Sequence, residues 1–327
     1  MEEIKMTKIG IIGVGAVGSA FLYAALNKGI EADYVLVDAF PEYAKAQAKD
    51  LNDAACSMAN NGSTFKSGGY EDLKDAQVIV ITASVKPKDG VLKDRLELLT
   101  DNAKLMSIIG DSIKKSGFNG ITIIASNPVD TMALVYQQAT KFEPKKVISS
   151  GTILETARMK KFLSENINIK AGSITGFVIG EHGSRCLIPF SKIRIGLGSL
   201  KDWLANGSIT KDWLDNLNQR VKDEAFEIIS GKGITNFGIG ENLAEITQAI
   251  LTDRQAIYSL GVQLPSDYAN HGVYFGLPVI LGKDGYRHLP KIRLDEDEQT
   301  LFDNYSKEIK ETAIQVLSNL NIKPDFQ

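Results

Sequence analysis

The sequence has 327 residues, a hydrophobic fraction of 43%, a charged fraction of 24% and a net charge of −3. These values describe a globular chain long enough for two domains, and they exclude a disordered or fibrous protein. The 37 Lys and Arg residues are interspersed with 40 Asp and Glu residues, so no basic excess indicates a nucleic-acid partner.

The first half of the chain alternates short β-branched runs with longer segments of helical periodicity. The predicted strands are Lys8–Ile12, Tyr34–Val37, Val78–Thr82, Ile121–Ala125 and Val147–Ser150. Between them apolar residues recur every three or four positions, as in Leu96, Leu99, Ala103 and Met106. This alternation predicts a parallel sheet covered by helices on both faces.

The rhythm changes near Gly151. A long helical pattern precedes two strand-like runs, Ile174–Ile179 and Ile188–Ile195, and further helices follow, separated by Gly- and Asn-rich turns. The last segment keeps one apolar stripe from Leu301 to Leu320, which predicts an amphipathic helix. We therefore predict an α/β fold, with a doubly wound parallel sheet in residues 1–150 and an α+β substrate domain in residues 151–327.

A glycine-rich turn follows the first predicted strand. Gly13, Gly15 and Gly18 form a GxGxxG motif before the next helical segment. In this motif Gly13 permits a tight turn, Gly15 lets the backbone approach a pyrophosphate, and Gly18 lets helix and strand pack closely. The helix N-terminus offers free N–H groups to the anion.

An acidic residue, Asp38, ends the second predicted strand, about 20 residues after Gly18. A carboxylate there accepts hydrogen bonds from the adenosine ribose and repels a 2′-phosphate. The two features together predict a Rossmann domain that binds NAD rather than NADP. A glycine turn used only for packing, with Asp38 as an ordinary turn residue, is the alternative.

Candidate chemical residues gather after Gly151. Glu155 and Arg158 stand three residues apart at the start of a helical segment, hence on neighbouring positions of one face. His182 lies in the Gly180–Gly183 tetrad after a strand-like run, and an imidazole suits proton transfer near neutral pH. The acid can hold the histidine, and the arginine can bind a carboxylate through two parallel hydrogen bonds. Taken singly, each of these residues also has a structural interpretation.

These motifs together resemble the L-lactate/malate dehydrogenase family, over essentially the whole chain. The resemblance rests on the GxGxxG motif with Asp38, on Asn127 before Pro128, on Glu155 with Arg158, on Gly180–Gly183 and on Lys232–Thr235. It implies an NAD-dependent oxidoreductase that acts on the CH–OH group of 2-hydroxy acids. It also implies a 2-keto or 2-hydroxy acid as the small-molecule partner and a homo-oligomer, either a dimer or a tetramer.

The resemblance further implies a role for each residue. His182 would donate a proton while Glu155 stabilises the imidazolium, and Arg158 would hold the substrate carboxylate. Asn127 would hydrogen-bond near the substrate and the nicotinamide, and Thr235 would line the substrate side of the pocket.

By the same resemblance, residues 83–95 form a mobile lid. Arg95 would swing in from it to polarise the substrate carbonyl. Pro87 occupies the lid position that reads the substrate side chain, where the family usually has glutamine for lactate and arginine for malate. Proline offers neither a hydrogen bond nor a charge, which disfavours a dicarboxylate and permits pyruvate or a bulkier apolar 2-keto acid.

Two features keep other functions open. The family usually has an aspartate where Glu155 stands, and the longer side chain leaves a catalytically silent NAD-binding protein as an alternative. Lys86 and Lys88 flank Pro87, and a lid that folds differently would present one of them to a second carboxylate, as in a malate dehydrogenase. We expect an L-lactate dehydrogenase or a relative that acts on bulkier apolar acids.

The compartment and the absence of a metal are predicted from what the sequence lacks. No stretch approaches the roughly 20 apolar residues that cross a bilayer, and no signal-peptide pattern stands at the N-terminus. Cys56 and Cys186 stand among apolar or small neighbours, so we expect two buried free thiols in a cytoplasmic protein that contacts no membrane. Three histidines and two separated cysteines form no cluster of metal-site spacing, so we expect no metal.

Overall fold

The computed structural model of the chain describes residues 6–58, 61–85 and 95–326, with only the backbone described for residues 95–98. The strands of the first half are β1 (Lys8–Ile12), β2 (Asp33–Val37), β3 (Thr64–Ser67), β4 (Val78–Ile81), β5 (Ile121–Ile124) and β6 (Val147–Ser149). The helices are α1 (Ala16–Asn27), α2 (Pro41–Cys56), α3 (Arg95–Ser116) and α4 (Val129–Thr140), with short 3₁₀ turns at Tyr70–Leu73 and Pro144–Lys146.

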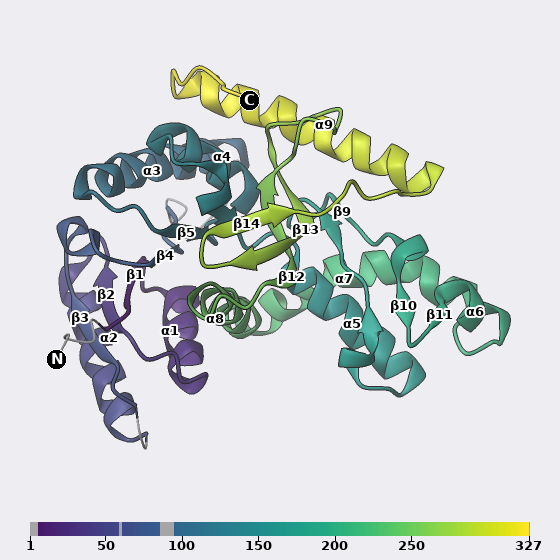
Figure 1. The fold of residues 1–327 in the computed structure, drawn as a ribbon, viewed down its shortest axis with the longest axis horizontal. Coiled ribbons are helices and arrows are strands. Elements are labelled where there is room, and N and C mark those ends of the chain that lie inside the picture. Colours follow the sequence, from purple (N-terminus) through teal and green to yellow (C-terminus); the bar gives the residue numbers. More distant parts are fainter. Residues whose placement is uncertain (1–5, 59–60, 86–94, 327) are drawn as a thin grey trace.

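The six strands of the first half form a parallel sheet in the order β3-β2-β1-β4-β5-β6. This is the strand order of doubly wound nucleotide-binding sheets, and it confirms the predicted fold. Figure 1 shows α3 and α4 on one side of the sheet and α1 on the other. The sequence patterns did not reveal β3, because it is a short edge strand that pairs only with β2.

The second half begins with α5 (Ile153–Ile167) and a 3₁₀ turn at Ala171–Ser173. Its short strands are β7 (Ile174–Thr175), β8 (Ile179–Gly180), β9 (Cys186–Leu187), β10 (Arg194–Ile195) and β11 (Gly198–Ser199), with a 3₁₀ turn at Phe190–Lys192. Then follow α6 (Leu200–Ala205), α7 (Lys211–Lys232), α8 (Phe237–Leu251), β12 (Ala256–Gln263), β13 (Tyr274–Gly282), β14 (Gly285–His288) and α9 (Glu296–Asn319).

One sheet continues through both halves of the chain. β12 pairs antiparallel with β6 at Gly261 and Ser149, and β13 then pairs with β12 on one side and with β8 on the other. The main hydrophobic core likewise includes residues from both halves, such as Ile9 and Val80 from the first and Leu260 and Phe275 from the second. The loop that follows β8 is therefore held on the same framework as the glycine-rich turn.

A smaller core lies in the second half alone, where Met159 and Leu163 of α5 pack with Leu217 and Val221 of α7. It supports the three-stranded sheet β11-β10-β7. In Figure 1 this part of the molecule lies away from the parallel sheet. The predicted strand Ile174–Ile179 is wrong in extent, because β7 joins this small sheet whereas β8 joins the large one.

Two other predictions for the second half were incomplete. The run Ile188–Ile195 is mostly not a strand, because Pro189 has no N–H for a ladder and a 3₁₀ turn follows it. The hairpin of β12 and β13 was not predicted. Pro278 lies inside β13, and a proline in a run argues against a central strand in sequence-based prediction.

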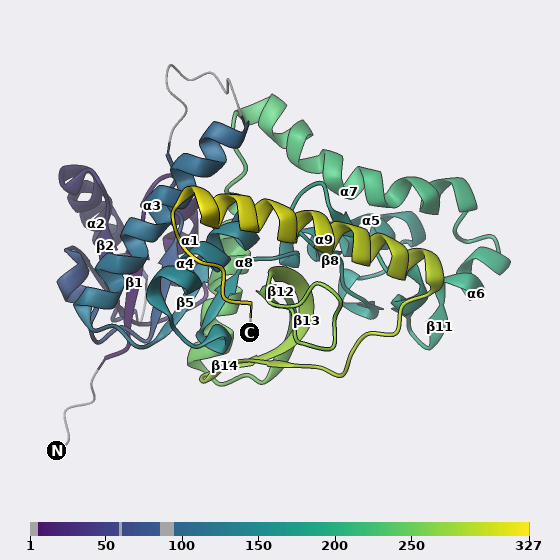
Figure 2. The ribbon, with the colours of Figure 1, turned by 90° about the horizontal axis from the view of Figure 1, so that it is seen from above.

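The C-terminal helix α9 confirms the predicted amphipathic segment. Its acidic start is a helix cap in which Asp295 Oδ1 accepts a hydrogen bond from the Glu298 N–H at 2.9 Å. Phe302 and Ile309 are buried along its inner face, whereas Leu301 is exposed. Figure 2 shows α9 lying along both halves of the chain, and it contacts α3 and α4 as well as β8 and β9.

The two cysteines differ in their environment. Cys186 is buried and free, as predicted. The prediction was wrong for Cys56, which is exposed at the end of α2, because the buried stripe of this helix runs through Ala48, Leu51 and Ala55. Within the described ranges, no helix combines the length and the apolar character needed to span a membrane.

Candidate active site

The glycine-rich turn connects the carboxyl end of β1 to α1. Gly13 has a φ of 90°, and a Cβ atom there would lie 2.6 Å from the backbone nitrogen of Ala83. A Cβ atom on Gly18 would lie 2.2 Å from the carbonyl oxygen of Gly13. Both positions therefore exclude any side chain. A Cβ atom on Gly15, by contrast, would have no described atom within 4 Å, so the turn borders open space.

Asp38 supports this turn from the end of β2. Its Oδ2 accepts a hydrogen bond from the Val14 N–H at 2.9 Å, and its Oδ1 accepts one from the Phe40 N–H at 3.0 Å. Because each carboxylate oxygen can accept more than one hydrogen bond, Asp38 keeps acceptor capacity toward a ligand. The carboxylate is half-buried beside the open space at Gly15.

The start of α1 has the donors that a phosphate group needs. Gly15 is the N-cap residue, and no side chain caps the helix. The first N–H groups of a helix have no partner within the helix, and they carry its positive dipole end. Open space beside Gly15, uncapped N–H groups and a carboxylate at Asp38 together fit the pyrophosphate and ribose of a dinucleotide.

Asn127 lies at the same edge of the sheet, between β5 and α4. Its side chain is exposed, and its peptide bond to Pro128 is cis. The backbone around it is fixed by neighbouring loops, since Asn102 Nδ2 donates to the Asn127 carbonyl at 3.2 Å and Ser126 Oγ donates to the Ala83 carbonyl at 2.6 Å. Asn127 is thus on the same side of the sheet as the glycine-rich turn.

Two charged residues of α5 are buried one helical turn apart. Glu155 is 2% exposed and Arg158 is 7% exposed. The helix is fixed at its start by the Thr152 hydroxyl, which donates a hydrogen bond to the Val178 carbonyl at 2.6 Å. A rigid helix therefore presents an anion and a cation to the interior from neighbouring positions.

His182, in the loop after β8, pairs with Glu155. The distance between His182 Nδ1 and Glu155 Oε1 is 2.7 Å. This distance is that of a close ion pair, and Glu155 Oε2 has no hydrogen-bond partner among the described residues. The longer glutamate side chain therefore reaches the imidazole and pairs with it mainly through charge.

The pairing changes the acidity of both groups. Burial by itself lowers the pKa of His182, but the charge of Glu155, with a contribution from Asp130, raises it to about 9. Burial by itself raises the pKa of Glu155, but His182 and Arg158 outweigh this effect and lower it below its ordinary value. At neutral pH the site thus contains a protonated imidazole next to an ionised carboxylate.

The Arg158 guanidinium has no hydrogen bond or ion pair with any residue in the described part of the chain. Burying a guanidinium without an anion costs free energy, which a bound carboxylate would offset. The planar guanidinium matches a carboxylate through two parallel hydrogen bonds. Arg158 is therefore the strongest candidate for an anion-binding residue near His182.

The remaining predicted site residues are less well defined. Thr235 is half-buried in the short connection between α7 and α8. Arg95 is the first residue of α3, but only its backbone is described. Pro87, and with it the predicted lid residues 86–94, lie outside the described residues.

Sequence reasoning missed two residues near His182. Asp130, in the first turn of α4, accepts a hydrogen bond from the His182 backbone N–H at 3.1 Å. Glu181 is buried and ion-paired with Arg185 at 3.0 Å. An acidic residue inside an otherwise apolar run was the available signal for Asp130. The partner of Glu181 required the tertiary structure.

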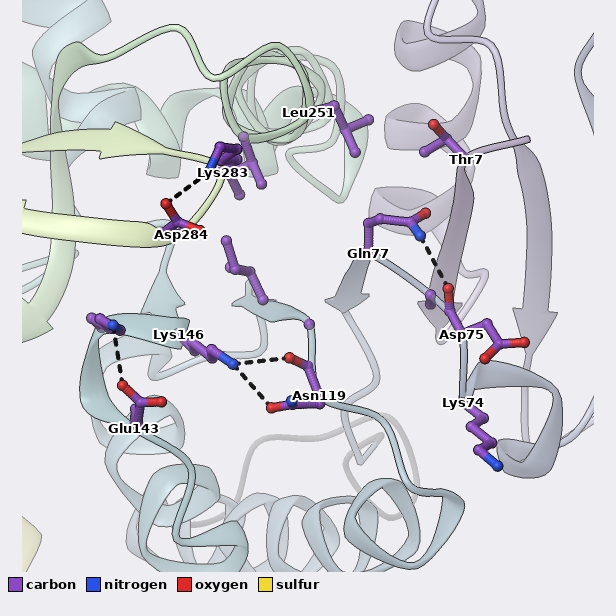
Figure 3. Close-up of a pocket in the computed structure, with 15 residues that line it drawn as sticks. Thr7, Lys74, Asp75, Gln77, Asn119, Glu143, Lys146, Leu251, Lys283 and Asp284 are labelled. Carbon is purple, nitrogen blue, oxygen red and sulfur yellow. Dashed lines mark hydrogen bonds and ion pairs between the residues drawn. The ribbon is translucent and has the colours of Figure 1, made fainter. Parts of the chain in front are cut away.

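A large cavity lies elsewhere, at the amino ends of the parallel strands. It has a volume of about 810 Å³ and is lined by residues that precede β1, β4, β5 and β6 and by the β13–β14 turn. Figure 3 shows Lys146 paired with Asn119 and Lys283 paired with Asp284, and Lys145 is likewise paired with Glu143. It is at the opposite edge of the sheet from Gly15 and His182, so it takes no part in their site.

The described residues include no group of three or more His, Cys, Asp or Glu side chains placed to hold a metal ion. The chemical groups of the candidate site are therefore the imidazole of His182, the carboxylates of Glu155 and Asp130, and the guanidinium of Arg158.

Comparison with known proteins places this chain in a family. Residues 7–149 match the NAD-binding domain of lactate/malate dehydrogenases, and residues 152–319 match their alpha/beta C-terminal domain. The L-lactate dehydrogenase of Mycoplasmoides gallisepticum is 41% identical over 322 residues, which cover 97% of this chain and 100% of that protein. L-lactate dehydrogenase 1 of Bacillus cereus is 36% identical over 313 residues, 95% of this chain and 99% of that protein.

Solved structures agree with this assignment. A lactate dehydrogenase from a Medee basin deep-sea metagenome library superposes with a TM-score of 0.91 at 34% identity, over 96% of this chain and 100% of that one. The minor L-lactate dehydrogenase of Enterococcus mundtii, in its ligands-bound form, has a TM-score of 0.91 at 31% identity, over 95% of this chain and 98% of that one. The chain belongs to the lactate/malate dehydrogenase family and is an NAD-dependent oxidoreductase that acts on the CH–OH group of 2-hydroxy acids.

Proposed function

We propose that this chain is an L-lactate dehydrogenase, which reduces pyruvate to L-lactate with NADH. The observation that carries the proposal is the pair of buried residues on α5, with Glu155 paired to His182 and Arg158 left without an anion among the described residues. A small 2-keto acid has the two groups that complete this arrangement, a carboxylate for Arg158 and a ketone oxygen for the imidazole. The relatives named L-lactate dehydrogenase support the same substrate class.

Arg158 binds the substrate carboxylate and thereby orients the ketone. A bidentate pair fixes both the position and the plane of the carboxylate, which reduces the freedom of the C2 carbon. Because the guanidinium is buried, its interaction with the carboxylate is screened little by water. Thr235 and Asn127 contribute to the pocket walls in this proposal, and Arg95 and Pro87 act from the predicted lid.

His182 donates the proton to the ketone oxygen. Its Nδ1 faces Glu155, so Nε2 is the nitrogen left to face the substrate. A pKa of about 9 keeps the imidazole protonated at neutral pH, as a proton donor requires. Glu155 stays ionised beside the imidazolium and, in the reverse direction, stabilises the proton that His182 takes from the hydroxyl group.

The cofactor is held at the carboxyl ends of β1 and β2. The uncapped N–H groups at the start of α1 bind the pyrophosphate next to Gly15, with Gly13 and Gly18 shaping the turn, and Asp38 accepts hydrogen bonds from the ribose. NADH, when bound, supplies the hydride that reduces the C2 carbon. In this proposal Asn127 hydrogen-bonds near both the nicotinamide and the substrate.

The experiment compares NADH oxidation by the purified protein with pyruvate, oxaloacetate, 2-ketoisocaproate and phenylpyruvate, as kcat/KM at one pH. We expect pyruvate to give the highest kcat/KM. A preference for the bulkier acids would change the proposal to a branched or aromatic 2-hydroxyacid dehydrogenase, and a preference for oxaloacetate would change it to a malate dehydrogenase. NADH binding without turnover of any acid would contradict the proposal.

We infer that the protein forms a homo-oligomer in the cytoplasm. Tyr23 of α1 and Phe40 and Tyr43 at the start of α2 expose large apolar side chains, 54%, 70% and 47% respectively. Such side chains gain stability when a second copy covers them. Light scattering should give two or four times the chain mass of 35.6 kDa.

The cytoplasmic location is inferred from the two cysteines. The thiols of Cys56 and Cys186 form no disulfide, which suits a reducing compartment such as the cytoplasm.

A further inference from the structure

A second carboxylate reaches His182 from the first half of the chain. Asp130 is the second residue of α4 and is 1% exposed. Its Oδ2 accepts a hydrogen bond from the backbone N–H of His182 at 3.1 Å. Its Oδ1 accepts one from the hydroxyl of Ser149 at 2.5 Å. The main chain of the histidine is thus attached to α4 and, through Ser149, to the end of β6.

The surrounding backbone is shaped around this carboxylate. Ser149 Oγ also accepts a hydrogen bond from the Gly151 N–H at 3.0 Å, so the same hydroxyl fixes the chain that leads into α5. Gly261 of β12 lies directly opposite. A Cβ atom there would lie 2.0 Å from Asp130 Oδ1 and 1.9 Å from Ser149 Oγ. The space that the carboxylate occupies exists only because β12 has no side chain at this position.

Burial of Asp130 is costly, and the structure shows what offsets it. Desolvation raises the pKa of Asp130 to about 7, and the negative charge of Glu181 contributes in the same direction. The hydrogen bonds from Ser149 and from the His182 backbone, and the positive charge of the imidazolium, oppose this rise. The stabilising partners of Asp130 are therefore the serine at the end of β6 and the histidine itself.

We propose that Asp130 is a positioning residue for His182, which fixes the main chain of the histidine from α4 while Glu155 pairs with its ring. The two carboxylates approach from different elements, one in each half of the chain. Together they restrict both the place of the residue and the direction of Nε2. This proposal rests on the proposed function, in which His182 is the proton donor.

Two variants separate the hydrogen bonds of Asp130 from its charge. In Asp130→Asn, the amide oxygen can still accept the His182 N–H, and the amide group can donate to Ser149 Oγ, so the main chain keeps its place without the charge. In Asp130→Ala both hydrogen bonds are lost. Thr131→Val is the matched control, because Thr131 is the next residue of α4 and its buried hydroxyl has no partner among the described residues.

The first measurement is kcat and KM for pyruvate, with the NADH Kd as a check that each variant retains its cofactor site. We expect kcat to fall about a hundredfold in Asp130→Ala and less than about tenfold in Asp130→Asn. Thr131→Val should match the wild type. The NADH Kd should stay within about twofold in all three. An Asp130→Ala enzyme with the kcat of the wild type would overturn the proposal.

The second measurement needs no turnover, so it tests the positioning role of Asp130 even if pyruvate is not the substrate. NMR hydrogen exchange of the His182 backbone amide, assigned with His182→Gln, should be faster in Asp130→Ala than in the wild type and in Asp130→Asn, because only the alanine variant lacks an acceptor for this N–H. A residue that only filled space would leave this exchange rate unchanged, and an unchanged rate in Asp130→Ala would overturn the proposal. Gly261→Ala is the independent variant, since its methyl group must displace the Asp130 carboxylate and should reproduce the kcat loss of Asp130→Ala.

Discussion

Glu155 lies 2.7 Å from His182 and one helical turn before Arg158, so a single helix carries both the partner of the imidazole and the candidate binder of the substrate carboxylate. Because both residues belong to α5, the distance between the carboxylate that pairs with His182 and the Arg158 guanidinium is set by a rigid element. The charge of Glu155 is the largest influence that raises the pKa of His182.

This relationship predicts the pH dependence of the reaction. In the proposed function, reduction of a 2-keto acid requires protonated His182, and the pKa of this residue is raised to about 9. We expect kcat/KM for reduction to be level at neutral pH and to fall as the pH rises through 9. Because the folded-state pKa exceeds the value of about 6.5 in an unfolded chain, the stabilisation by this pair is complete below pH 6.5 and is lost over the same rise.

Replacing the charge tests the role of Glu155. Glu155→Gln removes the charge that raises the His182 pKa, so the alkaline limit of reduction should move down toward about 6.5. At an assay pH of about 7.5, roughly one unit above that limit, kcat/KM should fall by about 10-fold or more, because most of the imidazole is then neutral. Glu165→Gln is the control, because Glu165 is an exposed residue of the same helix. An unchanged pH profile in Glu155→Gln would show that the pairing has no part in proton transfer.

Arg158→Lys tests carboxylate binding. Lysine keeps the charge but replaces the planar, bidentate donor with a single ammonium group. We expect kcat/KM for pyruvate to fall by about 10- to 100-fold, mainly through a higher KM, with an unchanged NADH Kd. Arg293→Lys, which makes the same change at an exposed position, should have no effect. Steady-state kinetics with pyruvate distinguish these outcomes, and equal KM values in the two variants would remove Arg158 from the substrate site.

The sequence allowed the parallel sheet to be predicted because its strands are short, fully buried and β-branched. Val78–Ile81 and Ile121–Ile124 are buried at every position, and such runs are recognisable without an alignment. The antiparallel strands β12 and β13 were missed because glycine and proline interrupt their apolar runs. Such residues can be required by contacts with distant parts of the chain. Gly261, for example, leaves room for the Asp130 carboxylate.

The local motifs of the candidate site could be identified in the sequence, but the contacts between distant residues could not. The motifs carrying Glu155, Arg158 and His182 are local, and their chemistry follows from residue type and spacing. The contact between Asp130 and the His182 backbone joins residues 52 positions apart, and no local pattern encodes it. Whether Glu155 could reach His182 with its extra methylene also depended on the relative positions of α5 and the loop after β8, which only the structure gives.

Substitutions of two glycines in the turn after β1 should have different effects, one on cofactor binding and the other on stability. In Gly15→Ala the methyl group meets no described atom, so the protein should fold with unchanged stability, but the methyl group would occupy the space for the pyrophosphate. We expect the NADH Kd to rise at least tenfold, by about 1.4 kcal/mol or more. In Gly18→Ala the methyl group collides with the Gly13 carbonyl, and stability should fall by about 1–3 kcal/mol. Thermal unfolding and NADH titration of the two variants separate these effects, and a destabilised Gly15→Ala would contradict the assignment of open space.

Glu298 predicts a stability effect far from the chemistry. It is buried at the start of α9, where its Oε1 accepts from the Ser191 N–H at 2.9 Å and its Oε2 accepts from the Ser191 hydroxyl at 2.6 Å. Glu298→Ala would leave these donors without an acceptor and remove the reciprocal bond of the helix cap, from the Asp295 N–H to Glu298 Oε2, so we expect a loss of about 2 kcal/mol in the free energy of unfolding.

Glu296→Ala is the matched change in the same helical turn. Glu296 is exposed, so its replacement should alter the free energy of unfolding by less than about 0.5 kcal/mol. Urea unfolding at fixed protein concentration measures both variants, and the fixed concentration matters because association of copies would add to the apparent stability. Since Glu298 connects α9 to the segment after β9, its loss should lower the unfolding midpoint while leaving the KM for pyruvate unchanged. Equal midpoints for Glu298→Ala and Glu296→Ala would mean that the Ser191 contacts contribute nothing to holding α9 in place.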